Sequence, residues 1–181
     1  MKPREHVWVG GVVAAGIFAP SLPAEAVAFW TATVLIDTDH YLDFIYYNRC
    51  RDFSIRGMFR FHRLSFQKIQ RRDFLDLSVF HTAEFFLGLY LLATWAGSSL
   101  LLAALLGGVF HLALDVVYLA WYRSVFKRAY SVAEYLVRRL IMIRGGDNPD
   151  RPFLDALDEM GVAEATFVPD SSAITPMPPT P

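Results

Sequence analysis

The stretch SSLLLAALLGGVFHLALDVVYLAWY, residues 98–122, decides the class of this protein. Asp115 is its only formally charged residue, and a helix of this length rises about 37 Å, enough to cross the hydrocarbon core of a bilayer. Hydrophobic residues make up 54% of the 181-residue chain and charged residues only 19%, whereas soluble domains typically contain about 25% charged residues. The sequence therefore predicts an all-α membrane protein.

Three further apolar segments precede this stretch and complete a predicted membrane-embedded bundle of about four helices. Leu77–Ala96 has about the 20 residues that a spanning helix needs. The other two segments, Val7–Ala19 and Ala24–Ile36, are shorter. They would span a thin region, form a re-entrant hairpin or pack inside the bundle. Glycine pairs at 10–11 and 107–108 lie within apolar segments, where we expect close helix packing.

The rest of the chain is basic, amphipathic or rich in proline. Residues 46–77 form an insertion rich in arginine, lysine and phenylalanine, which we expect to be helical and interfacial. Tyr130–Ile143 has apolar residues at helical spacing, which predicts a C-terminal amphipathic helix. We assign residues 1–167 to one helical membrane domain and residues 168–181 to a disordered, proline-rich tail.

Lysines and arginines are distributed asymmetrically between the two ends of the apolar segments. The connections at 20–23 and 95–99 contain neither residue type, while basic residues flank the opposite ends. By the positive-inside rule, the basic side is the cytoplasm. The sequence predicts a multi-pass protein of the inner (cytoplasmic) membrane with both termini in the cytoplasm. A signal peptide is the alternative for the N-terminus, because Ala24-Glu25-Ala26 is similar to a cleavage site.

The predicted topology brings imidazole and carboxylate side chains from four pieces of the sequence to one membrane face. Ionisable groups at membrane depth are costly and usually mark a functional site. Carboxylates and imidazoles that project inward from facing helices build the metal sites of helical bundles. We therefore predict a metal site, whose candidate ligands are His6, Asp37, His40, His81, His111 and Asp115.

The chemistry of these ligands narrows the choice of metal. The set contains imidazole and carboxylate but no thiolate, which suits zinc best, with manganese and iron as alternatives. The single cysteine, Cys50, has no cysteine or histidine partner nearby, which argues against a zinc knuckle. Glu84, three residues after His81, is the first candidate for a catalytic general base, and Asp39 is the second.

The order of these motifs resembles that of the YdjM-like inner-membrane proteins, a family described as membrane-bound metal-dependent hydrolases. The family pattern has an early histidine, then D-x-D-H, a histidine in T-H-S, and finally G-x-x-x-H-x-x-x-D. The resemblance covers about residues 1 to 120. The matching positions here are His6, the run Asp37 to His40, His81, and Gly107 with His111 and Asp115.

This chain departs from the family pattern at several positions. Ile36 stands where the family usually has proline before D-x-D-H, and His81 lies in F-H-T instead of T-H-S. His62-Arg63 lies far upstream of His81, whereas the family has H-R-G just ahead of T-H-S. The long 46–77 insertion separates these motifs. The chain therefore resembles a divergent member.

The resemblance implies a membrane-bound metal-dependent hydrolase, whose substrate we expect to be a phosphoester of a lipid or lipid-linked molecule. The alternatives are a non-catalytic membrane protein with a structural metal site, and a membrane scaffold or transport subunit whose histidines only pack or form hydrogen bonds. Membrane lipids are the expected partners, with anionic headgroups at Arg56–Phe74. A net charge of −1 gives no reason to expect nucleic acid. The oligomeric state is left open.

Overall fold

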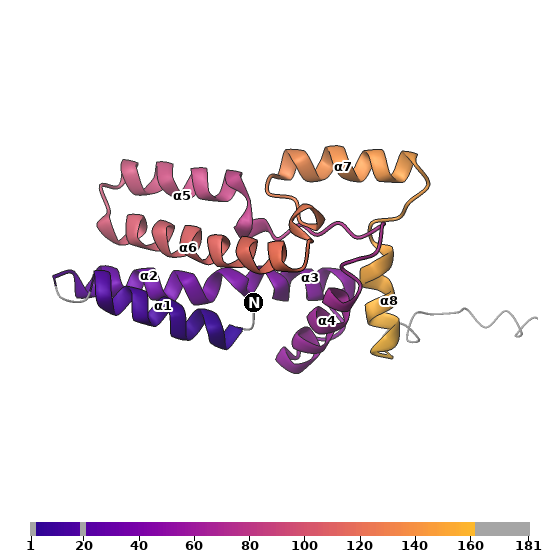
Figure 1. The fold of residues 1–181 in the computed structure, drawn as a ribbon, viewed down its shortest axis with the longest axis horizontal. Helices are drawn as coiled ribbons and strands as arrows, with labels where there is room; N and C mark the ends of the chain where they lie inside the picture. Colours follow the sequence, from indigo (N-terminus) through magenta and orange to yellow (C-terminus); the bar gives the residue numbers. More distant parts are fainter. Residues whose placement is uncertain (1–2, 19–20, 162–181) are drawn as a thin grey trace, which may run out of the picture.

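The computed structural model describes residues 3–18 and 21–161. Within these ranges the structure contains helices and no β-strand (Figure 1). This confirms the predicted all-α class. The predicted tail at 168–181 lies outside the described residues. The α-helices are α1 (Pro3–Ile17), α2 (Pro23–Leu35), α3 (Asp39–Tyr47), α4 (Ile55–Gln67), α5 (Ala83–Trp95), α6 (Ser99–Trp121), α7 (Val132–Arg144) and α8 (Arg151–Glu159). Short 3-10 helices are η1 (Ile36–Thr38), η2 (Val79–His81) and η3 (Val125–Lys127).

The helices form two groups along the long axis of the molecule (Figure 1). The first group contains α1, α2, α5 and α6, in which α6 packs against the other three and most extensively against α2. The second group contains α3, α4, α7 and α8, with α4 packed on α3 and α8. The helices η1 and η2 contact each other where the two groups meet. This junction positions the site described below.

The first group contains one helix of membrane-spanning length. Within the described ranges, α6 alone is long and apolar enough to cross a membrane by length and composition, while α1 and α5 are apolar but shorter. Only 28% of the most apolar part of α6 is buried. The expected length of the third segment is wrong, because α5 begins only at Ala83, where the Thr82 side chain accepts a hydrogen bond from the Phe85 backbone. The expected bundle of four helices thus has one member of spanning length.

Small residues bring α2 into close contact with α1 and α6. A Cβ atom on Gly107 would lie 2.2 Å from the carbonyl oxygen of Phe29, and one on Gly10 would lie 2.8 Å from Cγ2 of Thr33. The Thr33 hydroxyl lies 2.9 Å from the carbonyl oxygen of Phe29 and 3.1 Å from that of Gly107. The expected close packing at these glycines is therefore confirmed. This close packing fixes the position of α6 along α2, and therefore also relative to η1, which directly follows α2.

The second group has an aromatic core that includes α8, a helix missed in the sequence analysis. Phe153, Ala156 and Leu157 of α8 are buried at the i, i+3, i+4 spacing of an amphipathic helix. They pack with Phe44 of α3 and Phe61 of α4. The predicted 46–77 insertion is helical through α4, and much of its remainder lacks regular structure. This core holds α4 beside the junction of the two groups.

Candidate metal centre and adjoining cavity

Four side chains from three parts of the chain converge at the junction of the two helix groups. Asp37 comes from η1 and His81 from η2, while His111 and Asp115 lie one turn apart on the same face of α6. Each side chain offers one ligand atom, and the four atoms lie within 4.8 Å of one another. This cluster could therefore hold a metal ion.

The four separations between a histidine nitrogen and a carboxylate oxygen of the cluster are close to those of a tetrahedral metal site. Nε2 of His111 lies 3.2 Å from Oδ1 of Asp37 and 3.7 Å from Oδ2 of Asp115. Nε2 of His81 lies 3.7 Å and 3.9 Å from the same two oxygens. Ligands placed about 2.0–2.2 Å from a tetrahedral ion lie about 3.3–3.6 Å from one another. Small side-chain rotations would therefore bring all four atoms onto one ion.

Each imidazole of the cluster is held through its other ring nitrogen. Nδ1 of His111 donates to the carbonyl oxygen of Thr33 at 2.7 Å, because a carbonyl can only accept. Nδ1 of His81 lies 2.9 Å from Oδ2 of Asp39. The Nε2 atoms of both rings are buried and make no hydrogen bond within the described residues. Metal-ligating histidines are commonly oriented by such partners on the second nitrogen.

The local structure around η2 explains how His81 reaches the cluster. Thr82 has an extended backbone between η2 and α5, so that His81 belongs to η2 and not to a continuous helix over the apolar segment Leu77–Ala96. Asp39 is only 1% exposed, and its Oδ2 also accepts a hydrogen bond from the Phe80 backbone at 3.1 Å. Asp39 therefore fixes both the backbone and the ring at this position, a role that its place in the sequence did not reveal.

Two more predicted ligands lie against the four-atom cluster. The His6 ring stacks on His111 with a centroid separation of 3.9 Å, and its Nε2 lies 3.3 Å from Oδ1 of Asp115. Nε2 of His40 lies 3.5 Å from Oδ1 of Asp37. The six predicted metal ligands thus form one contiguous group, four of which offer atoms at the separations of a metal site.

The carboxylate of Glu84 binds the N-terminus of α7. Its Oε1 accepts a hydrogen bond from the Ser131 hydroxyl at 2.5 Å, and its Oε2 accepts one from the Val132 backbone at 3.1 Å. A carboxylate at this place satisfies free N–H groups and interacts favourably with the helix dipole. These contacts give Glu84 a structural role in joining α5 to α7, and they do not bring its carboxylate to the metal ligands.

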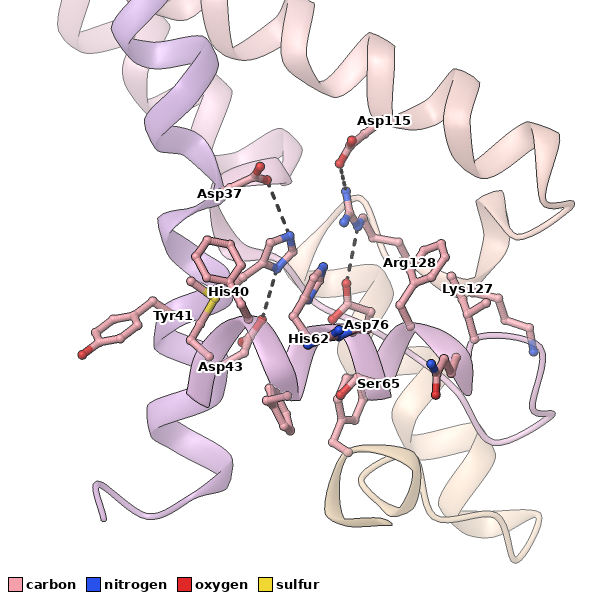
Figure 2. Close-up of a pocket in the computed structure, with 18 of the residues that line it drawn as sticks. Asp37, His40, Tyr41, Asp43, His62, Ser65, Asp76, Asp115, Lys127 and Arg128 are labelled. Carbon is pink, nitrogen blue, oxygen red and sulfur yellow. Dashed lines mark hydrogen bonds and ion pairs between the residues drawn. The ribbon is translucent and has the colours of Figure 1, made fainter. Parts of the chain in front are cut away.

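A cavity of about 1020 Å³ adjoins the cluster (Figure 2). Asp37 and Asp115 belong to both the cluster and the cavity wall. Apolar side chains, including Phe59 and Phe66 of α4 and Tyr118 of α6, form much of the remaining wall. The combination of apolar walls and a few polar groups is typical of a small-molecule site. The other charged or imidazole side chains of the wall are His40, Asp43, His62, Arg63, Asp76, Lys127 and Arg128.

Comparisons of the chain with protein-family models, curated proteins and solved structures gave no match.

Two cavity residues were missed as site residues in the sequence analysis. His62, which was assigned to a basic interfacial stretch, lies beside His40 with the ring centroids 4.1 Å apart. Arg128 is buried between two carboxylates, with Nη1 3.0 Å from Oδ2 of Asp115 and Nε 3.4 Å from Oδ2 of Asp76 (Figure 2). Both residues stand in stretches that contain several other basic residues. Their local sequence therefore did not distinguish them from exposed surface residues.

Burial and neighbouring charges shift the pKa values of the cavity residues outside the apolar helices. Burial tends to raise the pKa of Asp37, but the neighbouring histidines outweigh this effect and lower it. Burial tends to lower the pKa of His40, yet its hydrogen bond to Asp43 and the charge of Asp39 raise it to about 9. Burial and the charge of His40 lower the pKa of His62 to about 3. Around neutral pH, the cavity thus contains a protonated His40 beside a neutral His62.

Proposed function

We propose that this protein is a membrane-bound metal-dependent hydrolase that cleaves a phosphoester of a lipid or lipid-linked molecule. The observation that carries the proposal is the position of Asp37 and Asp115, which contribute ligand atoms to the cluster and also line the cavity. A molecule in the cavity would therefore lie against the metal position. Catalytic zinc keeps a position for water or substrate, and at this cluster the cavity side would provide it as a fifth position beside the four protein donors.

Zinc is the metal that the proposal assigns to the cluster. The donors are two imidazole nitrogens and two carboxylate oxygens at near-tetrahedral separations, a set that suits zinc, with manganese and iron as alternatives. A divalent cation at this position supplies a Lewis acid, which lowers the pKa of water and polarises a phosphoryl oxygen. The motif resemblance to the YdjM-like proteins supports a metal-dependent hydrolase.

The residues around the cluster would serve two purposes. Asp39 and the Thr33 carbonyl hold the two ligand imidazoles in place. His40 faces the cavity beside Asp37, where its imidazole can hold a proton and deliver it to a leaving oxygen. We assign no proton transfer to Glu84, because its carboxylate binds the start of α7.

The exposed surface of the first helix group supports a membrane location. Trp8 is 75% exposed, Trp95 is 86% exposed and Trp121 is 87% exposed, and α6 has apolar side chains facing outward along its length. Burying this surface among acyl chains is favourable at about 25 cal/mol per Å². Trp95 and Trp121 stand at the ends of apolar helices, where tryptophan commonly lies at the membrane–water interface.

The exposed face of α4 supports contact with anionic lipids near the cavity. Ile55 and Phe59 are 66% and 49% exposed, and both also line the cavity. Arg56 and Arg60 are exposed on the same helix. Apolar side chains at the acyl boundary combined with arginines near phosphates are typical of an interfacial helix. Such a helix at the cavity wall would admit a lipid substrate directly from the membrane.

The test of this function is metal-dependent cleavage of defined phosphoesters. Protein purified in detergent is incubated with bis(4-nitrophenyl) phosphate, or with phosphatidic acid in mixed micelles, after zinc loading or after chelation. We expect product only from the zinc-loaded protein, and none from His111→Ala. Protein that retains zinc but cleaves neither compound would support the structural-metal alternative, and protein that binds no metal would support a scaffold or transport subunit.

A further inference from the structure

We infer that Arg128 forms an anion-binding subsite, at which a phosphoryl group binds between the guanidinium and the metal position. This inference depends on the proposed function, and it identifies the residue that recognises the charged part of the substrate.

Arg128 is held in place by its backbone as well as by its side chain. The Asp76 backbone nitrogen donates to the Lys127 carbonyl at 2.9 Å, and the Ala129 nitrogen donates to the Asp76 carbonyl at 2.9 Å. These bonds form a short bridge between the segment before η2 and the segment after η3. The side chain of Arg128, which is 9% exposed, therefore extends from a fixed point to the cavity wall.

The guanidinium of Arg128 contacts an oxygen that belongs to the cluster. Its Nη1 lies 3.0 Å from Oδ2 of Asp115. The same oxygen lies 3.7 Å from Nε2 of His111 and 3.9 Å from Nε2 of His81. A phosphoryl group that reaches the metal position therefore also comes within reach of the guanidinium. Arginine is suited to this contact because its planar fork can donate two parallel hydrogen bonds to phosphate.

The guanidinium keeps donor capacity beyond its two carboxylate contacts. Nη1 donates to Asp115 and Nε lies 3.4 Å from Asp76, whereas a guanidinium carries five N–H donors. The other arginine of the wall and its lysine are placed differently. The Lys127 ammonium donates a hydrogen bond to the Arg71 carbonyl at 2.6 Å, and Arg63 is exposed on α4. Among the arginine and lysine side chains of the wall, Arg128 is therefore the one that contacts an oxygen of the cluster.

The charge of the cavity wall explains why anion binding should require the metal. Without a cation, the guanidinium of Arg128 is already paired with the carboxylates of Asp115 and Asp76, which leaves no excess positive charge beside it for a phosphate. A divalent ion in the cluster would add two positive charges beside Asp115 and make this part of the wall attractive to an anion. Phosphate binding is therefore expected only in the metal-loaded protein.

The experiment measures binding of inorganic phosphate to the full-length protein in detergent by isothermal titration calorimetry. Zinc content and thermal unfolding are measured on the same samples. The zinc-loaded wild type should bind phosphate and the chelated wild type should not. Arg128→Lys keeps the charge beside Asp115 and Asp76 but loses the fork. It should keep its zinc and bind phosphate about tenfold more weakly or worse, since charge-assisted bidentate contacts are lost.

Arg71→Lys is the matched control. Arg71 also bridges two carboxylates, with Nη2 2.7 Å from Oδ2 of Asp73 and Nη1 2.5 Å from Oδ2 of Asp155, but it does not line the cavity. The same substitution at this position should leave phosphate binding unchanged. A loss of binding equal to that of Arg128→Lys would mean that any change at an ion-paired arginine weakens binding, and it would overturn the inference.

Two other results would also overturn the inference. One is phosphate binding by Arg128→Lys equal to that of the wild type, and the other is a zinc-loaded wild type that binds no phosphate. In both cases the proposed metal site would still stand. If the wild type holds no zinc, the proposed function fails first and the inference fails with it. Should Arg128→Lys lose the wild-type unfolding transition, Arg128→Gln takes its place, with the same expected weakening and the same contrary result.

Discussion

Nδ1 of His81 lies 2.9 Å from Oδ2 of Asp39, although the two residues are 42 positions apart in the sequence. The contact joins η2 to the start of α3 and directs Nε2 of His81 towards Asp37 and Asp115. In metal sites, a carboxylate on the outer nitrogen of a ligand histidine fixes its ring and strengthens its donor atom. Asp39 thus orients His81 within the candidate metal cluster.

Asp39→Asn should weaken metal binding without removing a ligand. The substitution preserves the shape of the side chain but loses its charge, and changes of this kind typically reduce metal affinity about 10- to 100-fold. Zinc affinity is measured by competition with a chromophoric chelator. Asp43→Asn is the control, because Asp43 faces His40 and not a residue of the four-atom cluster. Equal zinc affinities of Asp39→Asn and the wild type would remove Asp39 from the site.

Gly107→Ala should destabilise the first helix group. The new Cβ would lie 2.2 Å from the Phe29 carbonyl oxygen, so α2 and α6 must separate. We expect a loss of about 1–3 kcal/mol in the free energy of unfolding, together with weaker zinc binding, because the separation also strains the His111–Thr33 contact. Gly88→Ala is the control, since nothing lies within 4 Å of its Cβ position. Denaturant unfolding in detergent measures the free energy of unfolding of both variants. A Gly107→Ala variant as stable as the wild type would contradict the close packing of α2 and α6.

Glu84→Gln should lower the melting temperature and leave the zinc content unchanged. A glutamine amide keeps the approximate shape but loses the charge that interacts with the N-terminus of α7. Ser131→Ala is the matched variant on the other side of this contact and should have a smaller effect in the same direction. If Glu84→Gln instead keeps the wild-type melting temperature and zinc but loses all hydrolysis, Glu84 is the general base first expected from the sequence.

The ion pair between Arg139 and Asp150 should stabilise the protein in a pH-dependent way. Arg139 donates to both carboxylate oxygens at 2.7 and 2.6 Å, and this interaction lowers the pKa of Asp150 although burial opposes it. A folded-state pKa below the unfolded value stabilises the protein above the unfolded pKa, and this stabilisation is lost as the pH falls through the lowered pKa.

Asp150→Asn tests this pH dependence. At neutral pH the variant should lose about 1 kcal/mol or less of unfolding free energy, because the pair is partly exposed. The difference from the wild type should shrink as the pH falls below about 4, the ordinary range of an aspartate pKa. The difference in unfolding free energy is measured from denaturant unfolding curves at several pH values. A difference that stays constant down to the lowest pH would show that the carboxylate charge is not involved.

The members of the candidate metal cluster could be predicted from the sequence because their spacing is local and chemically distinctive. His111 and Asp115 are four residues apart on an apolar helix, and Asp37 stands in a short acidic motif that ends another apolar segment. The expectation that these residues meet His81 at one place is confirmed by the geometry of the cluster. An ionisable group in an apolar helix is costly, which is why its position carries information.

Other features depend on contacts that hydrophobicity does not report. The apolar run from Leu77 continues through η2 into α5, so the hydropathy gave no sign that Thr82 begins a new helix. The spacing of apolar residues predicted the C-terminal helix correctly, but it could not show which face of that helix packs against the rest of the protein. In α7 the ion-paired Arg139 faces the protein, while Val137 and Ile141 are 58% and 62% exposed. Arg128 reaches Asp115 only through the bridge to Asp76, which joins distant segments.

Elemental analysis of the protein purified in detergent tests the metal centre most directly. We expect at least one zinc, manganese or iron ion per chain, retained through dialysis against metal-free buffer and lost from His111→Ala. His62→Ala changes a cavity imidazole outside the four-atom cluster and should retain the ion. A wild-type protein without bound metal, or a His111→Ala variant that keeps its metal, would contradict the account.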